Sequence, residues 1–473
     1  MSTRFPAGFT WGVATSAYQI EGAPLADGAG PSNWHRFAHE PGRTLGGDHG
    51  DVACDHYHRW REDVALIKRL GVVAYRFSFN WARIQPEGRG KVNPKGLDFY
   101  KRLADELLAR GIQPFATLHH WDLPAALEDA GGWLNRDTAL RFADFTEIMA
   151  GALDGQVEDW CTLNEPWVIM HAGHVEGVHP PGLANLALVP RVAHNLLLAH
   201  AEAVRAYRAN GRHRIGLVVN IEPKYAASMD PRDHAARARA EAYMNRLFVD
   251  PVFRGEWPEE LVEALGEDAW REVLAEPVAR LCEPIDWLGL NYYTRAVVRH
   301  KAGGFLDTEV VRQPGTHTEM GWEVFPQGLT DTLLWLHERT NGIPLYVTEN
   351  GAAFADPPPA DGRLHDAPRM AYLRDHLRAA MEAIEKGADL RGYFAWSLLD
   401  NFEWQFGYSK RFGLVHVDPA TGARTPKDSA RLFAEVAATN GEALADADPP
   451  GSAPFGRAYA SFAFAQGRSP IRS

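Results

Sequence analysis

The chain has 473 residues, of which 45% are hydrophobic and 23% charged, a globular composition that excludes disordered, collagenous and fibrous proteins. The 49 Lys and Arg against 61 Asp and Glu give a formal net charge of −12, which disfavours binding to nucleic acid or to an anionic membrane surface. Three widely spaced cysteines, an N-terminus without a secretory signal pattern and the absence of an apolar run of about 18 residues predict a cytoplasmic protein that does not enter the membrane.

Apolar runs with strand character recur along the chain, and most of them follow a helical segment and a glycine. The expected helices cover residues 62–70, 97–110, 138–154, 191–210, 329–341 and 369–386. The expected strands cover residues 9–14, 72–79, 112–118, 157–163, 215–220, 285–290, 345–348 and 390–396. A glycine just after a helix can take the left-handed conformation that turns the chain back toward the next strand.

Alternating helices and strands predict parallel strands, either in a closed eight-stranded barrel or in an open doubly wound sheet. No Gly-x-Gly-x-x-Gly follows the first strand, and polar residues end nearly every strand, so we expect the closed barrel. The predicted fold is α/β, a single (β/α)8 TIM barrel over residues 1–440 with long rim loops at 21–55 and 303–325. Residues 441–473 are expected to form a loosely packed C-terminal tail.

Two glutamates directly follow apolar strands, Glu165 after the fourth and Glu349 after the seventh. A single glutamate there is more often a solvated loop residue, but two that face one pocket are what glycoside hydrolysis needs. Amides, imidazoles and indoles at the other strand ends suit a ligand with many hydroxyl groups and an apolar ring face. Arg76, a charge inside a strand, is either a counter-ion for one of the glutamates or a buried ion pair that organises the barrel.

Several motifs resemble glycoside hydrolase family 1, the retaining β-glucosidase family. They are TLNEP at residues 162–166, VTENG at 347–351, FTWGVATSAYQIEG at 9–22, GDVACDHY at 50–57, DNFEW at 400–404 and RFGL at 411–414. The similarity extends to about residue 440. It implies a retaining exo-β-glycosidase that removes terminal β-D-glucosyl residues. Whether β-D-fucosides and galactosides are also substrates stays open at this point.

The resemblance also implies a role for each matching residue. Glu349 would be the nucleophile and Glu165 the acid/base. The sugar hydroxyls would be bound by Gln19, His120, Asn164, Glu403 and Trp404, with Trp396 stacked beneath the ring. The nucleophile would be held by Tyr293, assisted by Asn291 and Arg76. The aglycone side would be formed by Trp167, Trp322 and Phe412. A cis peptide is expected at Trp396–Ser397.

Two positions narrow the expected substrate to small unphosphorylated β-glucosides or cello-oligosaccharides. Family members that cleave thioglucosides have Gln in place of Glu165, and those that cleave phosphoglycosides have Ser in place of Glu403. A transglycosylase on the same site and a sugar-binding pseudoenzyme are the alternatives. No cofactor and no metal are expected, because His56 and His58 lack further ligands at a matching spacing.

Overall fold

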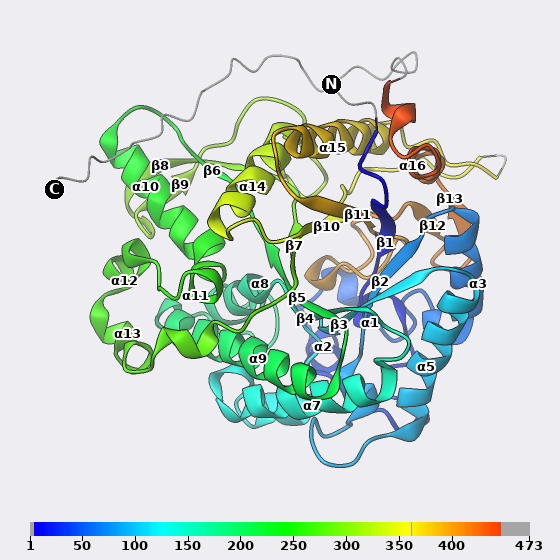
Figure 1. The fold of residues 1–473 in the computed structure, drawn as a ribbon, viewed down its shortest axis with the longest axis horizontal. Coiled ribbons are helices and arrows are strands. Elements are labelled where there is room, and N and C mark those ends of the chain that lie inside the picture. Colours follow the sequence, from blue (N-terminus) through cyan, green and yellow to red (C-terminus); the bar gives the residue numbers. More distant parts are fainter. Residues whose placement is uncertain (1–3, 361, 446–473) are drawn as a thin grey trace.

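The computed structural model describes residues 4–360 and 362–445. Eight parallel strands close into a barrel in the order β1-β11-β10-β7-β5-β4-β3-β2 (Figure 1). They are β1 (Thr10–Ala14), β2 (Ala74–Ser78), β3 (Gln113–His119), β4 (Asp159–Asn164), β5 (Arg214–Asn220), β7 (Trp287–Asn291), β10 (Leu345–Asn350) and β11 (Leu390–Trp396). All eight expected strands and the (β/α)8 fold are therefore confirmed.

Helices surround this barrel and connect its strands (Figure 1). The six expected helices are α3 (His56–Arg69), α5 (Pro94–Ala109), α7 (Asp137–Leu153), α9 (Val189–Asn210), α14 (Pro326–Arg339) and α15 (Ala367–Glu385). Helix α3 begins six residues earlier than expected, because His56, Tyr57 and Trp60 are buried on its first two turns. Gly71 has the predicted left-handed φ of 71°, whereas Gly211 after α9 is extended, with φ −104°.

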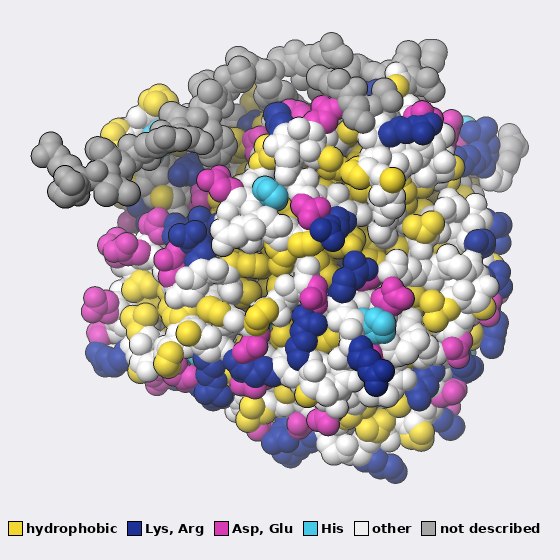
Figure 2. Space-filling view, in the orientation of Figure 1, with side chains coloured by type: hydrophobic (Ala, Val, Ile, Leu, Met, Phe, Trp, Pro, Cys, Tyr) yellow, Lys and Arg dark blue, Asp and Glu magenta, His cyan; other side chains and the backbone are white. Residues whose placement is uncertain are grey.

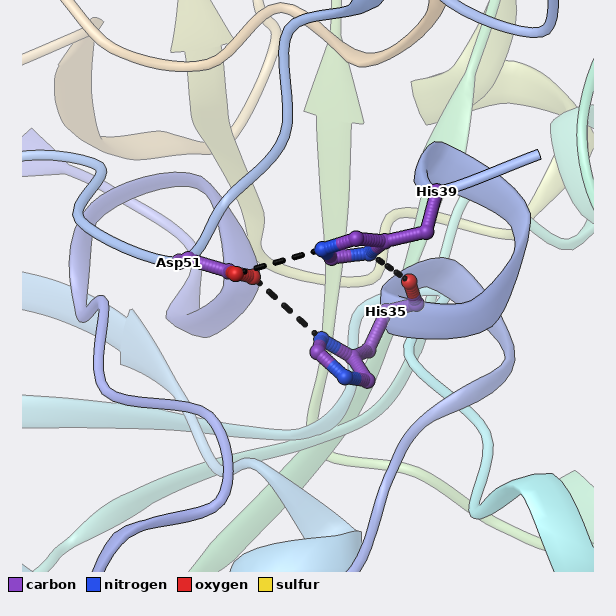
Figure 3. A group of neighbouring side chains, drawn as sticks. All are labelled: His35, His39 and Asp51. Atoms are coloured by element: carbon purple, nitrogen blue, oxygen red, sulfur yellow. Dashed lines mark hydrogen bonds and ion pairs between the residues drawn. The ribbon is translucent and has the colours of Figure 1, made fainter. Parts of the chain in front are cut away.

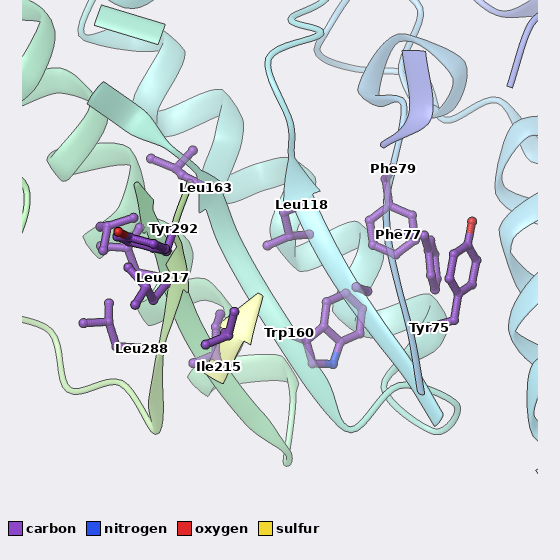
Figure 4. Close-up of a cluster of buried hydrophobic side chains, with 14 of the residues drawn as sticks. Tyr75, Phe77, Phe79, Leu118, Trp160, Leu163, Ile215, Leu217, Leu288 and Tyr292 are labelled. Carbon is purple, nitrogen blue, oxygen red and sulfur yellow. The ribbon is translucent and has the colours of Figure 1, made fainter. Parts of the chain in front are cut away.

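Side chains of the barrel strands divide between two buried layers. Tyr75 and Phe77 of β2 point outward into the cluster beneath the helices, together with Leu118 and Leu217 (Figure 4). Ala74 belongs to a second cluster with residues such as Phe115, Val218 and Phe394, which fills the inside of the barrel. Because alternate strand residues face opposite sides, Arg76 points into the barrel.

The rim segments contain more structure than the sequence predicted. The segment 303–325 is partly a sheet, since β8 (Ala296–Phe305) pairs with β6 (Lys224–Ala226) and β9 (Thr308–Val310). The segment 21–55 includes the short helix α2 (Asn33–Ala38). The connection from β5 to β7 carries α10 (Pro231–Glu241), α11 (Asp250–Phe253), α12 (Glu259–Leu265) and α13 (Glu267–Leu274). These pairings link distant parts of the chain, so local patterns do not reveal them.

The described chain continues as packed structure past residue 440. After β12 (Val415–Val417), β13 (Arg424–Pro426) and α16 (Asp428–Ala438), a short 3-10 helix covers Glu442–Ala445. Leu444 in this helix is buried, and its carbonyl accepts a hydrogen bond from Arg378 on α15. Residues 441–445 are thus packed rather than loose, and the rest of the expected tail lies outside the described residues.

The surface seen in Figure 2 carries basic and acidic side chains in close alternation, with apolar patches between them. On this face the described residues do not gather into a broad basic area. No helix in the described part of the chain has the length and apolar character to cross a membrane.

Candidate active site

Glu349 lies in a hydrogen-bonded position inside the barrel, and an irregularity in its strand puts it there. Strict alternation would place it on the same side as Val347, which packs outward. The register of β10 shifts after Val347 against both β7 and β11, and such a bulge re-aims the side chains that follow. The Glu349 carboxylate accepts one hydrogen bond from Arg76 (Nη1 to Oε1, 2.7 Å) and one from Tyr293 (hydroxyl to Oε2, 2.7 Å).

Glu165 precedes helix α8 (Pro166–Met170) and has a left-handed backbone, with φ 48° and ψ 64°. Its strand β4 also shifts register, between Cys161 and Asn164 against β5. The Glu165 carboxylate accepts a hydrogen bond from the Asn291 amide (Nδ2 to Oε1, 2.6 Å). In contrast to Glu349, it has no ion pair with a described basic residue at this site.

Both carboxyl groups are buried, and their surroundings affect their pKa values differently. Burial and the charge of Glu349 raise the pKa of Glu165 well above its ordinary value. Burial also raises the pKa of Glu349, but Arg76, Tyr293 and Asn291 oppose this increase. A cation and hydrogen bonds in contact favour the ionised form, so Glu349 is the more readily ionised carboxyl of the two.

Asn164 connects the groups around the two glutamates. Its Oδ1 accepts hydrogen bonds from Arg76 (2.6 Å) and Asn291 (3.1 Å), and its Nδ2 contacts His120 Nε2 at 3.1 Å. Burial lowers the pKa of His120 well below its ordinary value, so the ring is neutral and Nε2 accepts from the Asn164 amide. The resemblance implies that Asn291 assists in holding Glu349. In the structure, the short hydrogen bond of Asn291 goes to Glu165, and Asn291 also lowers the pKa of Glu349.

Gln19 and Glu403 form a second polar group at the site. The Gln19 amide donates to the Phe402 carbonyl (2.9 Å), to Asn401 Oδ1 (3.1 Å) and to Glu403 Oε2 (3.3 Å). Burial, and then the charge of Glu349, raise the pKa of Glu403 to about 8, against the opposing effect of Gln19. Glu403 is therefore close enough to Glu349 to respond to its charge.

Aromatic rings form a wall beside these groups. Trp404 lies 4.7 Å from Trp121 and 4.6 Å from Trp34, and His120 is stacked with Trp396 at 5.8 Å between ring centroids. Trp404 and Trp121 both have positive φ, 53° and 78°, a conformation that is strained for bulky side chains and that recurs at functional sites. The Trp396–Ser397 peptide is cis, as the resemblance implied.

A cavity of about 510 Å³ brings many of the predicted residues together. Its lining includes Glu165, Asn291, Tyr293, Glu403, Trp404, Trp167 and Trp322. Glu349 is almost fully buried and reaches this region through its contact with Tyr293. Phe412 lies behind the lining, 6.0 Å from Tyr293 and 6.2 Å from Trp322.

The prediction did not include Trp121, which lines the cavity and donates from Nε1 to the Asn164 carbonyl at 3.0 Å. Its position directly after the predicted site residue His120 was the available signal. His56 and His58, considered and set aside as metal ligands, pair separately with Asp63 and Asp55. Among the described residues, the group of three metal-ligating side chains that does occur is His35, His39 and Asp51, which come from α2, the residue after it and the following loop, outside this cavity.

Comparison with known proteins identifies the family. The model of glycosyl hydrolase family 1 matches residues 1–442. The chain belongs to glycosyl hydrolase family 1. It is 48% identical over 442 residues to beta-glucosidase A of Thermotoga maritima, covering 93% of this chain and 98% of that protein. It is 45% identical to a bifunctional beta-D-glucosidase/beta-D-fucosidase of Bifidobacterium breve, covering 91% of this chain and 97% of that protein.

Solved structures agree with this assignment. The family 1 beta-glucosidase of T. maritima in complex with isofagomine lactam superimposes with a TM-score of 0.90 at 47% identity, covering 92% of this chain and 99% of that chain. Membership of this family makes the chain a glycoside hydrolase and agrees with the closed barrel described above.

Proposed function

We propose that this glycosyl hydrolase family 1 member is a retaining exo-β-glucosidase. The observation that carries the proposal is the unequal environment of two buried carboxyl groups at one site. The Glu349 carboxylate accepts hydrogen bonds from a guanidinium and a phenol hydroxyl, whereas among the described side chains the Glu165 carboxylate accepts one from an amide. One carboxylate that is ionised and one that is protonated are what double displacement requires.

Each carboxyl group then has one role in the reaction. Ionised Glu349 attacks the anomeric carbon while protonated Glu165 gives its proton to the leaving oxygen, and a covalent glycosyl-enzyme forms. Glu165, now ionised, removes a proton from water, and this water releases the sugar with its original configuration. Arg76 and Tyr293 hold Glu349 in place for the attack.

The remaining residues of the site bind the sugar and the aglycone. Gln19, Glu403, Trp404, Asn164 and His120 offer buried donors and acceptors to the hydroxyl groups, and Trp396 offers a flat apolar face. The His120 Nδ1 atom lacks a hydrogen-bond partner among the described residues, which leaves it available to a hydroxyl. Trp167 and Trp322 in the cavity lining, with Phe412 behind, supply an apolar aglycone surface.

The names of similar proteins support the substrate class. They include beta-glucosidases, a 1,4-beta-D-glucan glucohydrolase of Thermotoga neapolitana and the bifunctional glucosidase/fucosidase. We therefore propose small β-glucosides or cello-oligosaccharides as substrates, with β-D-fucosides and galactosides as further ones. Three unpaired cysteines support the proposal of a reducing, cytoplasmic location.

Azide rescue of two alanine variants tests the roles. Glu165→Ala should still form the glycosyl-enzyme from dinitrophenyl β-glucoside, because this phenolate leaves without a proton, and azide should then give the β-glucosyl azide. Glu349→Ala should be almost inactive, and azide should give the α-glucosyl azide, because it enters from the vacated face. Azides of the opposite configurations would reverse the assignment, and full activity in either variant would remove that residue from the reaction.

A further inference from the structure

Four side chains that commonly bind metals meet on the rim segment 21–55, away from the catalytic cavity. His35 lies on α2 and His39 at its C-terminal end, one turn apart on the same face, and His49 and Asp51 come from the following loop. His35, His39 and Asp51 each direct a ligand atom toward a common point, within 4.8 Å of one another (Figure 3). This pair of histidines at i and i+4 has the spacing of a helical metal site.

The hydrogen bonding of His39 defines its tautomer. Its Nδ1 lies 2.6 Å from the His35 carbonyl oxygen, which can only accept, so Nδ1 carries the proton. In a neutral ring Nε2 then has a lone pair, and this lone pair faces Asp51 Oδ2 at 3.2 Å. Two acceptors at that distance repel each other unless a proton or a cation lies between them. A backbone carbonyl that orients a histidine in this way is the usual outer contact of a metal ligand.

Three further atoms of the group have no hydrogen bond. His35 Nδ1, His49 Nδ1 and Asp51 Oδ1 are buried atoms with no hydrogen-bond partner among the described residues. His35 Nδ1 lies 3.4 Å from Asp51 Oδ1, and His49 Nδ1 lies 3.5 Å from Asp51 Oδ2. Buried polar atoms are nearly always satisfied in folded proteins, so two imidazole nitrogens and one carboxylate oxygen without hydrogen bonds at one place indicate a missing partner.

The distances suit a zinc ion. With ligands at 2.0–2.1 Å, neighbouring ligand atoms of a tetrahedral site are about 3.3 Å apart. Asp51 approaches the two rings at this range through different oxygens, Oδ1 to His35 Nδ1 at 3.4 Å and Oδ2 to His39 Nε2 at 3.2 Å. Imidazole nitrogens with a carboxylate oxygen form a donor set typical of zinc.

We propose that His35, His39 and Asp51 bind one Zn²⁺ ion, with water in the fourth position and His49 supporting Asp51. The ring of His49 lies over that of His39, 4.6 Å away and nearly parallel. This stacking keeps His49 beside the metal and positions it to hold the carboxylate of Asp51.

The metal would join two segments that lie behind the aromatic wall of the active site. On α2, Trp34 packs against Trp404 with 4.6 Å between ring centroids. In the loop, the His49 carbonyl accepts a hydrogen bond from the Tyr408 hydroxyl at 2.9 Å. A metal that fixes α2 to this loop therefore stabilises the support of Trp404 and takes no part in the chemistry. Its role is structural.

Zinc titration of the chelator-treated full-length protein tests the proposal. Isothermal titration should show one Zn²⁺ per chain, with affinity at least about tenfold weaker in His39→Gln and in His35→Gln. His58→Gln is the matched control, because His58 is exposed and pairs with Asp55 outside the proposed site, and this variant should bind zinc like the wild type. Cobalt in place of zinc should give the visible absorption of a tetrahedral site in the wild type but not in His39→Gln.

Folding and stability complete the test. Activity on an aryl β-glucoside without zinc checks that each variant is folded, and zinc should raise the melting temperature of the wild type and of His58→Gln but not of His39→Gln. Absence of stoichiometric binding, or equal binding by folded His39→Gln, would overturn the site. Binding without any rise in melting temperature would overturn its structural role.

Discussion

Replacement of Tyr293 by Phe tests how the protein keeps its proposed nucleophile ionised. The Tyr293 hydroxyl donates to Glu349 Oε2 at 2.7 Å. Burial and the nearby carboxylates raise the pKa of Tyr293 well above its ordinary value, so the hydroxyl remains a donor throughout the working pH range. In Tyr293→Phe, Glu349 keeps the Arg76 guanidinium at 2.7 Å and the pKa-lowering effect of Asn291.

The magnitude follows from the kind of hydrogen bond that is lost. A hydrogen bond to a charged group is worth about 1.5–3 kcal/mol, and one pKa unit corresponds to about 1.4 kcal/mol. Because this bond favours the ionised carboxylate, its loss should raise the Glu349 pKa by about 1–2 units. The acid limb of the pH profile should move upward by the same amount, while the basic limb, assigned to Glu165, stays in place.

The assay is the pH dependence of kcat/KM on an aryl β-glucoside. Tyr292→Phe is the matched control, since Tyr292 is the neighbouring residue and its buried hydroxyl donates to the Phe325 carbonyl at 2.6 Å instead of to Glu349. This control should leave the acid limb unchanged. An unchanged acid limb in Tyr293→Phe would refute the argument that this hydroxyl stabilises ionised Glu349, and a shift of the basic limb instead would exchange the two roles.

Two further variants address sugar binding and acid stability. Glu403→Ser should lower kcat/KM on unphosphorylated aryl glucoside by about 2- to 13-fold for each hydrogen bond lost, at about 0.5–1.5 kcal/mol each, because a pKa of about 8 leaves Glu403 largely protonated at neutral pH; wild-type kinetics would mean that Glu403 does not touch the sugar. Burial lowers the pKa of His119 to about 3, so the unfolded chain takes up a proton below about pH 6.5 that the folded chain does not, and stability falls by about 1.4 kcal/mol per pH unit. In His119→Leu, the unfolding free energy should therefore fall less steeply between pH 6.5 and 4.5, by this amount per pH unit. Urea unfolding at a series of pH values measures this, and the same pH dependence in the variant and the wild type would exclude the effect.

The barrel could be predicted because its signals are local. Each strand is a short apolar run, most follow a helix and a glycine, and the polar residues follow directly at the strand ends. The sheet of β6, β8 and β9 could not be found in this way, since its pairing of Lys224 with Ala296 depends on contacts between distant segments. The same applies to the packing of the 3-10 helix Glu442–Ala445 on α15.

The candidate site shows a similar division. The types of residue at the strand ends identified Glu165 and Glu349, but simple alternation would have turned Glu349 outward with Val347. The register shifts in β4 and β10 depend on how neighbouring strands pair. The residue types within either strand do not predict these shifts. The motif was therefore a better guide to this side chain than periodicity alone.

The histidine group was missed for a different reason. The i and i+4 spacing of His35 and His39 is visible in the sequence, but no expected helix covered these residues. The third ligand, Asp51, lies twelve residues after His39 in a loop whose course only tertiary contacts determine, such as the hydrogen bond from the Ala23 amide to the Asp51 carbonyl. His56 and His58 attracted attention instead because they are closer together in the chain.

The sequence allows two roles for Arg76, a counter-ion for one of the two glutamates or a buried ion pair that organises the barrel, and its contacts show that both apply. From β2 its guanidinium reaches Glu349 on β10 and Asn164 on β4, at 2.7 and 2.6 Å. Arg76 thus forms an ion pair that links strands across the barrel interior, and it is also the counter-ion of the proposed nucleophile. A buried charge without a partner is costly, so neither Arg76 nor Glu349 can move without leaving the other unpaired. The interaction that organises the barrel is the same one that holds this carboxylate ready to react.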